Sequence, residues 1–287
     1  MRTMADQYHL GLGSTDYQNR SLLRRISEFF YKPSQPLLAG QYLLGVDIWD
    51  GQGIMDFPAL EAGGVSVAFI RLNNMAGGHH PDEMFNNYWN APTNVIKIPY
   101  FVYNPWVTGQ ANYDYLAAHM PANAKAVMID IEVKMTGYAP ATYAAQVEIF
   151  KNLVKTKWNT IIYTAEWFLS NLSYWPTDVV YHWAQYPSTL YTAMTITWDR
   201  MRELLIPLST PSNAARCPGT VKVWQCSADR IVLPGSANRM DVNVIYMSLP
   251  ELQQFAGVTV ENPGPAIKHL LQVYDDGSLV IDGNTHP

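Results

Sequence analysis

The sequence contains little charge and almost no cysteine, and each shortage excludes a class of protein. Only 15% of the 287 residues are charged and 48% are hydrophobic, a composition typical of a filled globular core and not of a disordered chain. The formal net charge of −5 does not supply the basic surface that phosphate binding needs, so we expect no nucleic acid partner. Cys217 and Cys226, the two cysteines, cannot form a structural zinc site alone. They are either free thiols or one local disulfide, and we expect no metal and no cofactor.

Long apolar runs are also missing. No stretch reaches the length that spans a bilayer, so we expect no transmembrane segment. The first 30 residues carry several arginines and lack the apolar segment of a secretion signal. The run NRSLLRRISEFFY, residues 19–31, has apolar residues at helical spacing, and two prolines follow it. We interpret residues 1–40 as an N-terminal extension with one amphipathic helix.

Short apolar runs alternate with amphipathic segments between residues 41 and 257. Strands are predicted at YLLGVDIW, VSVAFIRL, VIKIPYFVY, AVMIDIEV, NTIIYTA, VVYHWAQY, TVKVWQC and NRMDVNVIY. Between two of them, Tyr138–Thr156 has apolar residues at 3.6-residue spacing and is predicted to be a helix. This order predicts an α/β fold: an irregular (β/α) TIM-like barrel whose strands crowd together on the C-terminal side.

Residues 258–287 follow the predicted barrel as a linker and a tail. The linker sequence VENPGP contains proline and glycine, and two apolar runs then flank the turn sequence DDGS. We predict a C-terminal β-hairpin here, too short to be stable as a domain by itself. The predicted organisation is therefore an extension at 1–40, a barrel at 41–257 and a tail at 258–287.

The run AVMIDIEV places two carboxylates in an otherwise apolar strand. Residues two apart face the same side of a strand, so Asp130 and Glu132 project together. Like charges repel, and partial burial makes ionising either group more costly. A carboxyl pair of this kind is useful in a site where one carboxyl group must stay protonated near neutral pH, as the general acid of glycoside hydrolysis does. On these residues alone, a metal pair or a salt-bridged strand end fits equally well.

Other acids lie near the ends of the first and last predicted strands. Asp47 closes the first apolar run, and Asp241 and Asn243 share one face of the last. Because side chains at the C-terminal strand ends of a parallel barrel converge, we expect Asp47 and Asp241 to join the central pair. Nine Trp and 18 Tyr supply flat amphipathic surfaces that suit sugar rings, with core packing as the alternative use of those rings.

These segments, taken in order, resemble the glycoside hydrolase family 25 lysozymes, the Chalaropsis-type muramidases. GVDIWDGQGIMDF resembles the opening block of the family, and MIDIE matches its central D-x-E. FIRL, DEMF, IIYTAEWF, HWAQY, VWQC and DVN match further blocks in family order, over roughly residues 43–256. The resemblance is divergent, since Trp49 stands where the family has serine and Cys226 where it has tyrosine.

The resemblance implies a barrel enzyme that cleaves the β-1,4 bond between N-acetylmuramic acid and N-acetylglucosamine in bacterial peptidoglycan. Position by position, it makes Glu132 the proton donor, Asp130 its acidic partner, and Asp47 and Asp241 the other acids of the cleft. Arg71 either binds substrate or offsets the clustered carboxylates, and we favour the second. The side chains predicted to line the substrate site are Arg71, Tyr103, Tyr163, Trp183, Tyr186 and Trp224.

Two alternatives stay open from the sequence. Another barrel glycosidase acting on N-acetylated glycans, such as a family 18 chitinase, requires acids where Lys125 and Met128 stand. A non-catalytic wall-binding or phage structural module would not need all four acids. The resemblance, together with the missing secretion signal, leads us to expect a cell-wall enzyme released by lysis or carried on a phage particle, as an endolysin is.

Overall fold

The computed structural model describes residues 42–75, 78–187 and 210–258, together with the backbone of three short strands near the C-terminus. The helix predicted within residues 1–40 lies outside the described residues. The domain boundaries proposed near residues 40 and 257 therefore stay predictions.

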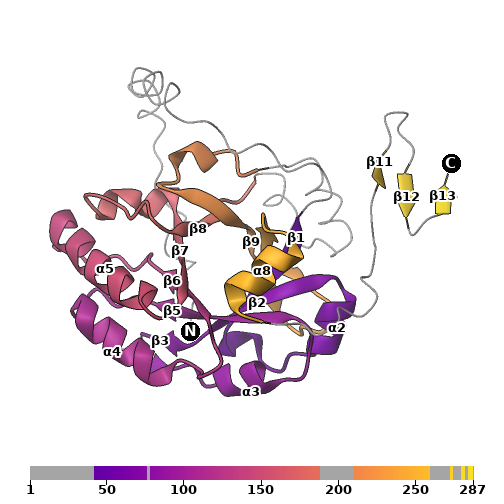
Figure 1. Ribbon diagram of the computed structural model, residues 1–287, viewed down its shortest axis with the longest axis horizontal. Helices are drawn as coiled ribbons and strands as arrows, with labels where there is room; N and C mark the ends of the chain where they lie inside the picture. The colour runs from indigo at the N-terminus through magenta and orange to yellow at the C-terminus, as the bar shows by residue number, and fades with distance from the viewer. Residues whose placement is uncertain are drawn as a thin grey trace. The chain divides into compact units, whose positions relative to one another are not determined.

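Eight strands close into a barrel (Figure 1). Around the barrel they follow the order β1 (Leu43–Ile48), β10 (Arg239–Ile245), β9 (Thr220–Val232), β8 (Val180–Ala184), β7 (Asn159–Ala165), β6 (Ala126–Asp130), β5 (Ile96–Val102) and β2 (Val65–Arg71). All pairings are parallel except those of β10, which is antiparallel to both β9 and β1. The predicted α/β barrel is confirmed, and its irregular side lies where β9 and β10 follow each other without a helix.

Helices cover the outside of the parallel strands, with α4 and α5 side by side (Figure 1). The helical segments around the barrel are η2 (Asp50–Gln52), α2 (Phe57–Ala62), α3 (Phe85–Asn90), α4 (Gly109–His119), α5 (Pro140–Lys155), η3 (Glu166–Asn171) and η4 (Ala214–Arg216). A two-stranded ribbon, β3 (Asn73–Asn74) with β4 (His80–Pro81), precedes α3. The predicted amphipathic helix is α5, which begins at a proline in its first turn and buries Val147, Phe150 and Val154.

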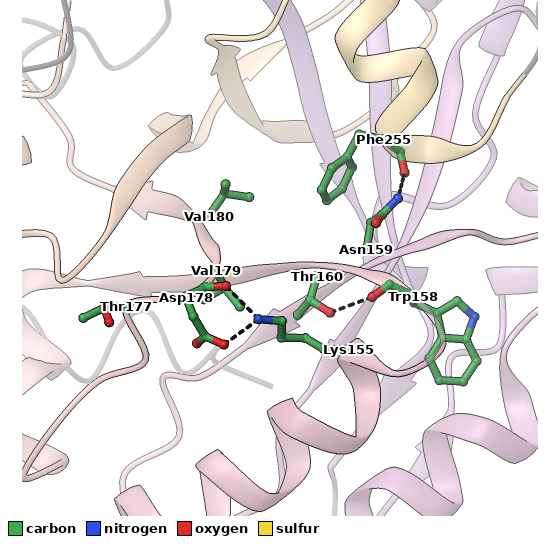
Figure 2. Close-up of a pocket in the computed structure, with 9 residues that line it drawn as sticks. All are labelled: Lys155, Trp158, Asn159, Thr160, Thr177, Asp178, Val179, Val180 and Phe255. Carbon is green, nitrogen blue, oxygen red and sulfur yellow. Dashed lines mark hydrogen bonds and ion pairs between the residues drawn. The ribbon is translucent and has the colours of Figure 1, made fainter.

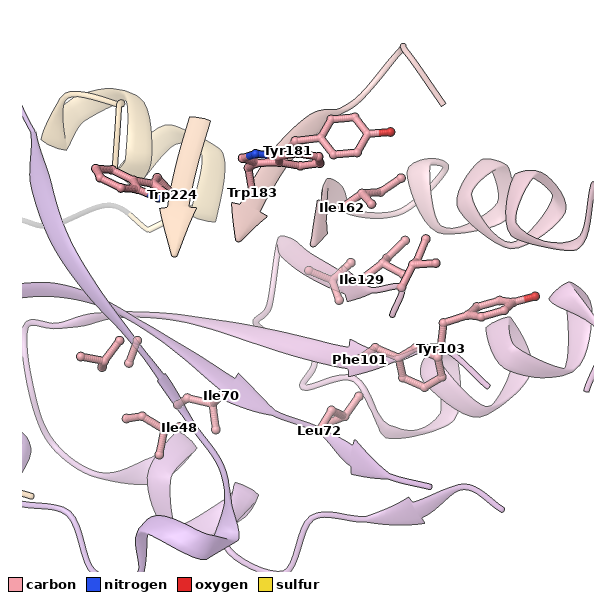
Figure 3. Packing of buried hydrophobic residues seen from close by; sticks show 14 of the residues in the cluster. Ile48, Ile70, Leu72, Phe101, Tyr103, Ile129, Ile162, Tyr181, Trp183 and Trp224 are labelled. Atoms are coloured by element: carbon pink, nitrogen blue, oxygen red, sulfur yellow. The ribbon is translucent and has the colours of Figure 1, made fainter. Parts of the chain in front are cut away.

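Alternate side chains of each barrel strand enter two separate apolar layers. The inner layer fills the barrel and includes Phe69 and Met128. The outer layer lies between the strands and the helices and includes their chain neighbours Ile70 and Ile129, which Figure 3 shows packed among other apolar side chains. Because side chains alternate along a strand, one step in sequence moves a residue from the inside of the barrel to the outside.

The helix α8 (Leu249–Ala256) closes one end of the barrel. Its Leu252 and Ala256 belong to the inner apolar layer. Asn159, the first residue of β7, donates a hydrogen bond of 2.7 Å to the backbone oxygen of Phe255. The parallel strands begin at this end, so α8 fills the amino-terminal mouth of the barrel with apolar side chains.

Near the C-terminus, three short strands form a separate antiparallel sheet: β11 (Gln272–Val273), β12 (Leu279–Ile281) and β13 (Asn284–His286). The pairing of β11 with β12 is the hairpin predicted from the sequence, whereas β13 was not predicted. In the described part of the chain, no helix combines the length and the apolar character needed to cross a membrane.

Candidate active site

The four predicted acids meet at the carboxyl-terminal mouth of the barrel. Asp47 and Asp241 lie directly opposite each other in the antiparallel register of β1 with β10. Asp130 is the last residue of β6, and Glu132 follows it by two positions. After burial, the nearby charge of Glu132 contributes to raising the pKa of both Asp47 and Asp130. The structure therefore brings the first, central and last strands of the sequence to one electrostatically connected site.

The side-chain amide of Gln225 on β9 links two of these acids to two tyrosines. Its Nε2 donates to Asp47 Oδ2 at 2.7 Å and to Asp241 Oδ2 at 3.3 Å. Its Oε1 accepts hydrogen bonds from the hydroxyls of Tyr163 and Tyr186, at 2.9 and 2.5 Å. If the amide were rotated by 180°, its oxygen would face the two carboxylates and its NH₂ group would face the two tyrosine hydroxyls. These four contacts therefore fix the orientation of the amide.

The second oxygen of Asp47 is held from the other side. Asn243 Nδ2 donates to Asp47 Oδ1 at 2.8 Å, and Asn243 Oδ1 lies 2.7 Å from His182 Nε2. Burial lowers the pKa of His182 to about 3, against the opposing effect of its hydrogen bond with Asn243. The imidazole is therefore neutral, and the acceptor on Asn243 assigns its proton to Nε2. Burial raises the pKa of Asp47 to about 7 despite the two amide donors.

The central pair is the most strongly perturbed part of the site. Burial, and next the charge of Glu132, raise the pKa of Asp130 well above its usual range. Burial also raises the pKa of Glu132 to about 7. Among the described residues, no donor lies within hydrogen-bonding range of the buried Asp130 Oδ1. The pair therefore retains a proton near neutral pH and presents one acceptor oxygen that the described residues do not satisfy.

Arg71 ends β2 beside the acids but forms its ion pairs with other carboxylates. Its Nη2 lies 2.7 Å from Asp50 Oδ1, and its Nε lies 2.8 Å from Asp82 Oδ2. The guanidinium also lies over the ring of Trp49, 4.9 Å from its centroid. Arg71 still acts on the cluster, because its charge lowers the pKa of Asp130 against the larger opposing effect of burial. Two aspartates outside the cluster thus hold the cation near it.

Tyrosine side chains complete the inner wall of this mouth. Tyr163 and Tyr186, both predicted, contact Gln225 as described above. Tyr100 on β5 was not predicted, yet the charges of Asp47, Asp130 and Asp241 all contribute, after burial, to raising its pKa well above the usual value. Tyr100 therefore lies among the acids.

Three predicted substrate-binding residues do not reach the site. Tyr103, Trp183 and Trp224 are 0% exposed and belong to the outer apolar layer, where Figure 3 labels them. Trp183 and Trp224 each stand next in sequence to an inward-facing residue, His182 and Gln225 respectively. Trp183 and Trp224 lie on the predicted strands but on their outer faces, and Tyr103 directly follows β5. We correct the prediction: these three rings pack the outside of the barrel and are removed from the candidate site.

Figure 2 shows a separate cavity of about 350 Å³, and none of the four acids lines it. It is lined by residues around the start of β7, the end of α5 and Phe255 of α8, which places it at the amino-terminal end of the barrel. Its polar groups bind one another, as when Lys155 Nζ pairs with Asp178 and Thr160 Oγ1 donates to the backbone oxygen of Trp158. In the described ranges, no group of three or more His, Cys, Asp or Glu side chains could hold a metal ion.

A closed barrel of mainly parallel strands, with coupled carboxyl groups at its carboxyl-terminal mouth, suits an enzyme that hydrolyses glycosidic bonds by acid catalysis. The model of the glycosyl hydrolases family 25 matches residues 46–202 of this chain. The chain belongs to this family and is a glycoside hydrolase. The matched range contains Asp47, Arg71, Asp130 and Glu132 and ends before Asp241. No curated protein sequence gives a significant match.

Solved structures share the barrel at low sequence identity. The bacterial lysozyme from Streptomyces coelicolor has a TM-score of 0.57 and 20% identity, covering 76% of this chain and 98% of that one. A family 25 glycosyl hydrolase from Bacillus anthracis has a TM-score of 0.56 and 16% identity, covering 79% and 99%. The muramidase from Trichobolus zukalii has a TM-score of 0.57 and 18% identity, covering 75% and 98%. At these low sequence identities, the structural similarity shows a shared fold and nothing more.

Replacing Gln225 with leucine should destabilise the protein. Leucine is similar in size but leaves Asp47 Oδ2 without its 2.7 Å donor and two tyrosine hydroxyls without their acceptor. Each buried polar group left unsatisfied costs about 1–3 kcal/mol, so we expect the free energy of unfolding to fall by at least ~2 kcal/mol. Urea unfolding at neutral pH measures this, with the exposed Gln254→Leu as the control. An equal effect of the two changes would contradict the bridging role of Gln225.

Replacing Glu132 with glutamine should change how stability depends on pH. The pKa of Glu132 is about 7 in the folded chain and near 4.5 without the fold, so the folded state binds this proton more tightly. Its favourable contribution is complete below pH 4.5 and is lost as pH rises to about 7. The variant should therefore match the wild type at pH 4 and exceed it at pH 8, by about 1–3 kcal/mol.

Thermal melting of both proteins across this pH range measures the difference, with the same substitution at exposed Glu83 as the control. If the melting temperatures of wild type and Glu132→Gln differ by the same amount at every pH from 4 to 8, Glu132 titrates as an ordinary carboxyl and the prediction is contradicted.

Proposed function

We propose that this protein is a muramidase that cleaves the β-1,4 bond between N-acetylmuramic acid and N-acetylglucosamine in bacterial peptidoglycan, with Glu132 as the general acid. The observation that carries the proposal is the coupled pair of Asp130 and Glu132 at the mouth of the barrel. A general acid must be protonated at the pH of the reaction and must give up its proton readily, and a pKa near 7 meets both conditions.

In the proposed reaction, Glu132 transfers its proton to the glycosidic oxygen as the bond from that oxygen to the anomeric carbon breaks. The leaving sugar departs with a new hydroxyl group, and positive charge develops on the sugar that remains. Asp130 supports this step through its Oδ1, which has no partner among the described residues. This oxygen either stabilises the developing positive charge or accepts a hydrogen bond from the acetamido N–H of the substrate. The oxygen of a water molecule then bonds to the anomeric carbon, and the proton that this water releases returns the Glu132 carboxylate to its acid form.

Asp47 and Asp241 are proposed to shape the opposite wall of the cleft. Gln225 holds both carboxyl groups, and Asn243 holds the second oxygen of Asp47, so neither side chain can rotate freely. Tyr163 and Tyr186 lie at the same mouth, with their hydroxyls fixed on Gln225. We propose these two rings as substrate contacts, with Arg71 as the cation that moderates the field of the acids.

The choice of peptidoglycan rests on the family and on its structural relatives. The chain belongs to the glycosyl hydrolases family 25, and solved structures that share its barrel include the bacterial lysozyme from Streptomyces coelicolor and the muramidase from Trichobolus zukalii. A bacterial cell wall is therefore the proposed place of action, and glycan strands of peptidoglycan are the proposed partner. Release by lysis or transport on a phage particle fits this place of action.

Glu132→Gln should remove the activity while the fold remains. Glutamine keeps the shape of the side chain but has no acidic proton, and general acid catalysis contributes about 10²–10⁴-fold. The assay is the digestion of purified peptidoglycan, with the new reducing ends identified by mass spectrometry. Wild type and Glu83→Gln should release fragments that end in N-acetylmuramic acid, and Glu132→Gln should release at least about a hundredfold less. New ends of N-acetylglucosamine, or undiminished release by Glu132→Gln, would contradict the proposal.

A further inference from the structure

We propose that Trp106 and Trp167 are stacking platforms for sugar rings of the glycan strand, one on each side of Glu132. They extend substrate binding beyond the two sugars that share the broken bond. This inference rests on the proposed function, because it takes a glycan strand as the substrate.

Both indole rings are unusually exposed for their size. Trp106 is 58% exposed and Trp167 is 51% exposed, whereas Trp183 and Trp224 are fully buried. An aromatic ring that is half exposed gains less packing energy from the fold than a buried one, and it leaves apolar surface that a ligand can cover.

The topology places the two segments that carry these rings at the mouth that carries the acids. Trp106 lies in the connection between β5 and α4, and Trp167 lies in η3, directly after β7. In the barrel, β6 lies between β5 and β7 and carries Asp130 at its end. Neighbouring strands are spaced about 4.8 Å apart, so the two connections leave the barrel roughly 10 Å from each other with Glu132 between them.

The chain around Trp106 is held rigidly although the ring itself is exposed. Asn104 Oδ1 accepts from the backbone N–H of Trp106 at 2.9 Å. The buried Asn112 of α4 in turn holds Asn104, accepting from its N–H and donating to its carbonyl oxygen, each at 2.9 Å. A turn fixed by two buried amides can present a ring to a ligand with little loss of conformational entropy on binding.

The backbone around Trp167 is also held in place by its neighbours. Its chain neighbour Phe168 is fully buried in the outer apolar layer and anchors η3. The ring of Trp167 meets that of Phe168 edge to face, with centroids 5.4 Å apart. The preceding Glu166 accepts a hydrogen bond of 2.7 Å from Asn213 Nδ2, which ties the start of η3 to another loop.

Sugar rings offer apolar C–H faces with hydroxyl groups at their edges, which match the flat face of an indole. A strand that passes over Glu132 would place successive sugars toward β5 on one side and toward β7 on the other. The two platforms should therefore favour long glycan strands over a disaccharide, and they should act on binding more than on the chemical step.

The test measures binding in the Glu132→Gln protein, which holds the substrate without cleaving it. Isothermal titration calorimetry with soluble peptidoglycan glycan strands, and separately with the disaccharide, compares this protein with versions that also carry Trp106→Ala or Trp167→Ala. Each alanine should weaken binding of the long strands about 2–10-fold and leave binding of the disaccharide nearly unchanged. Trp→Phe at either position should restore most of the lost affinity.

Trp158→Ala is the matched control, because Trp158 immediately precedes β7 at the amino-terminal end of the barrel. In the otherwise wild-type enzyme, Trp106→Ala and Trp167→Ala should raise KM for long strands with little change in kcat. If the wild type cleaves peptidoglycan but neither change weakens binding of long strands more than Trp158→Ala does, this inference is overturned and the proposed function stands. If the wild type cleaves no peptidoglycan, the proposed function itself fails.

Discussion

The amide of Gln225 is the contact on which the candidate site depends. Two strands from opposite ends of the chain, β1 and β10, place Asp47 and Asp241 face to face, and two carboxyl groups in that position repel each other unless a donor lies between them. Gln225 Nε2 donates to both, and the hydroxyls of Tyr163 and Tyr186 keep that amide in the required orientation. The pairing of β1 with β10, which closes the barrel, therefore also sets the positions of Asp47 and Asp241, and Gln225 makes that arrangement stable.

Burial sets the chemistry of this mouth. Because α8 fills the amino-terminal end with apolar side chains, the interior near the acids is shielded from water on that side, and desolvation is the first cause of the raised pKa values of Asp47, Asp130 and Glu132. The fold gives up stability at neutral pH to keep these groups close together. That cost is understandable where a proton must be held and released, which connects the electrostatics of the site to glycoside hydrolysis.

Much of this arrangement could be predicted from the sequence. Apolar runs located all eight barrel strands. The spacing of Asp130 and Glu132 left a metal pair and a salt-bridged strand end open, and only Asp47, Asp241 and the family resemblance favoured an active site there. It was harder to predict which face of each strand points into the barrel. Trp183 and Trp224 are large rings that suit a sugar site, but in their strands the neighbouring His182 and Gln225 point inward. Counting in steps of two from Asp241 reaches Asn243, but no local pattern aligns β9 with β10, whose register shifts at two places. Long-range register, and not local preference, decides which polar groups meet.

The central claim is that the folded barrel holds Glu132 protonated near neutral pH. The most direct measurement is a carbon-13 NMR titration of the side-chain carboxyl carbon of Glu132 in the folded protein, assigned by its loss in Glu132→Gln. A titration midpoint at a pH of about 7 is the result that this account predicts. A midpoint near the ordinary value of 4.5, in a protein that remains folded throughout, would contradict it.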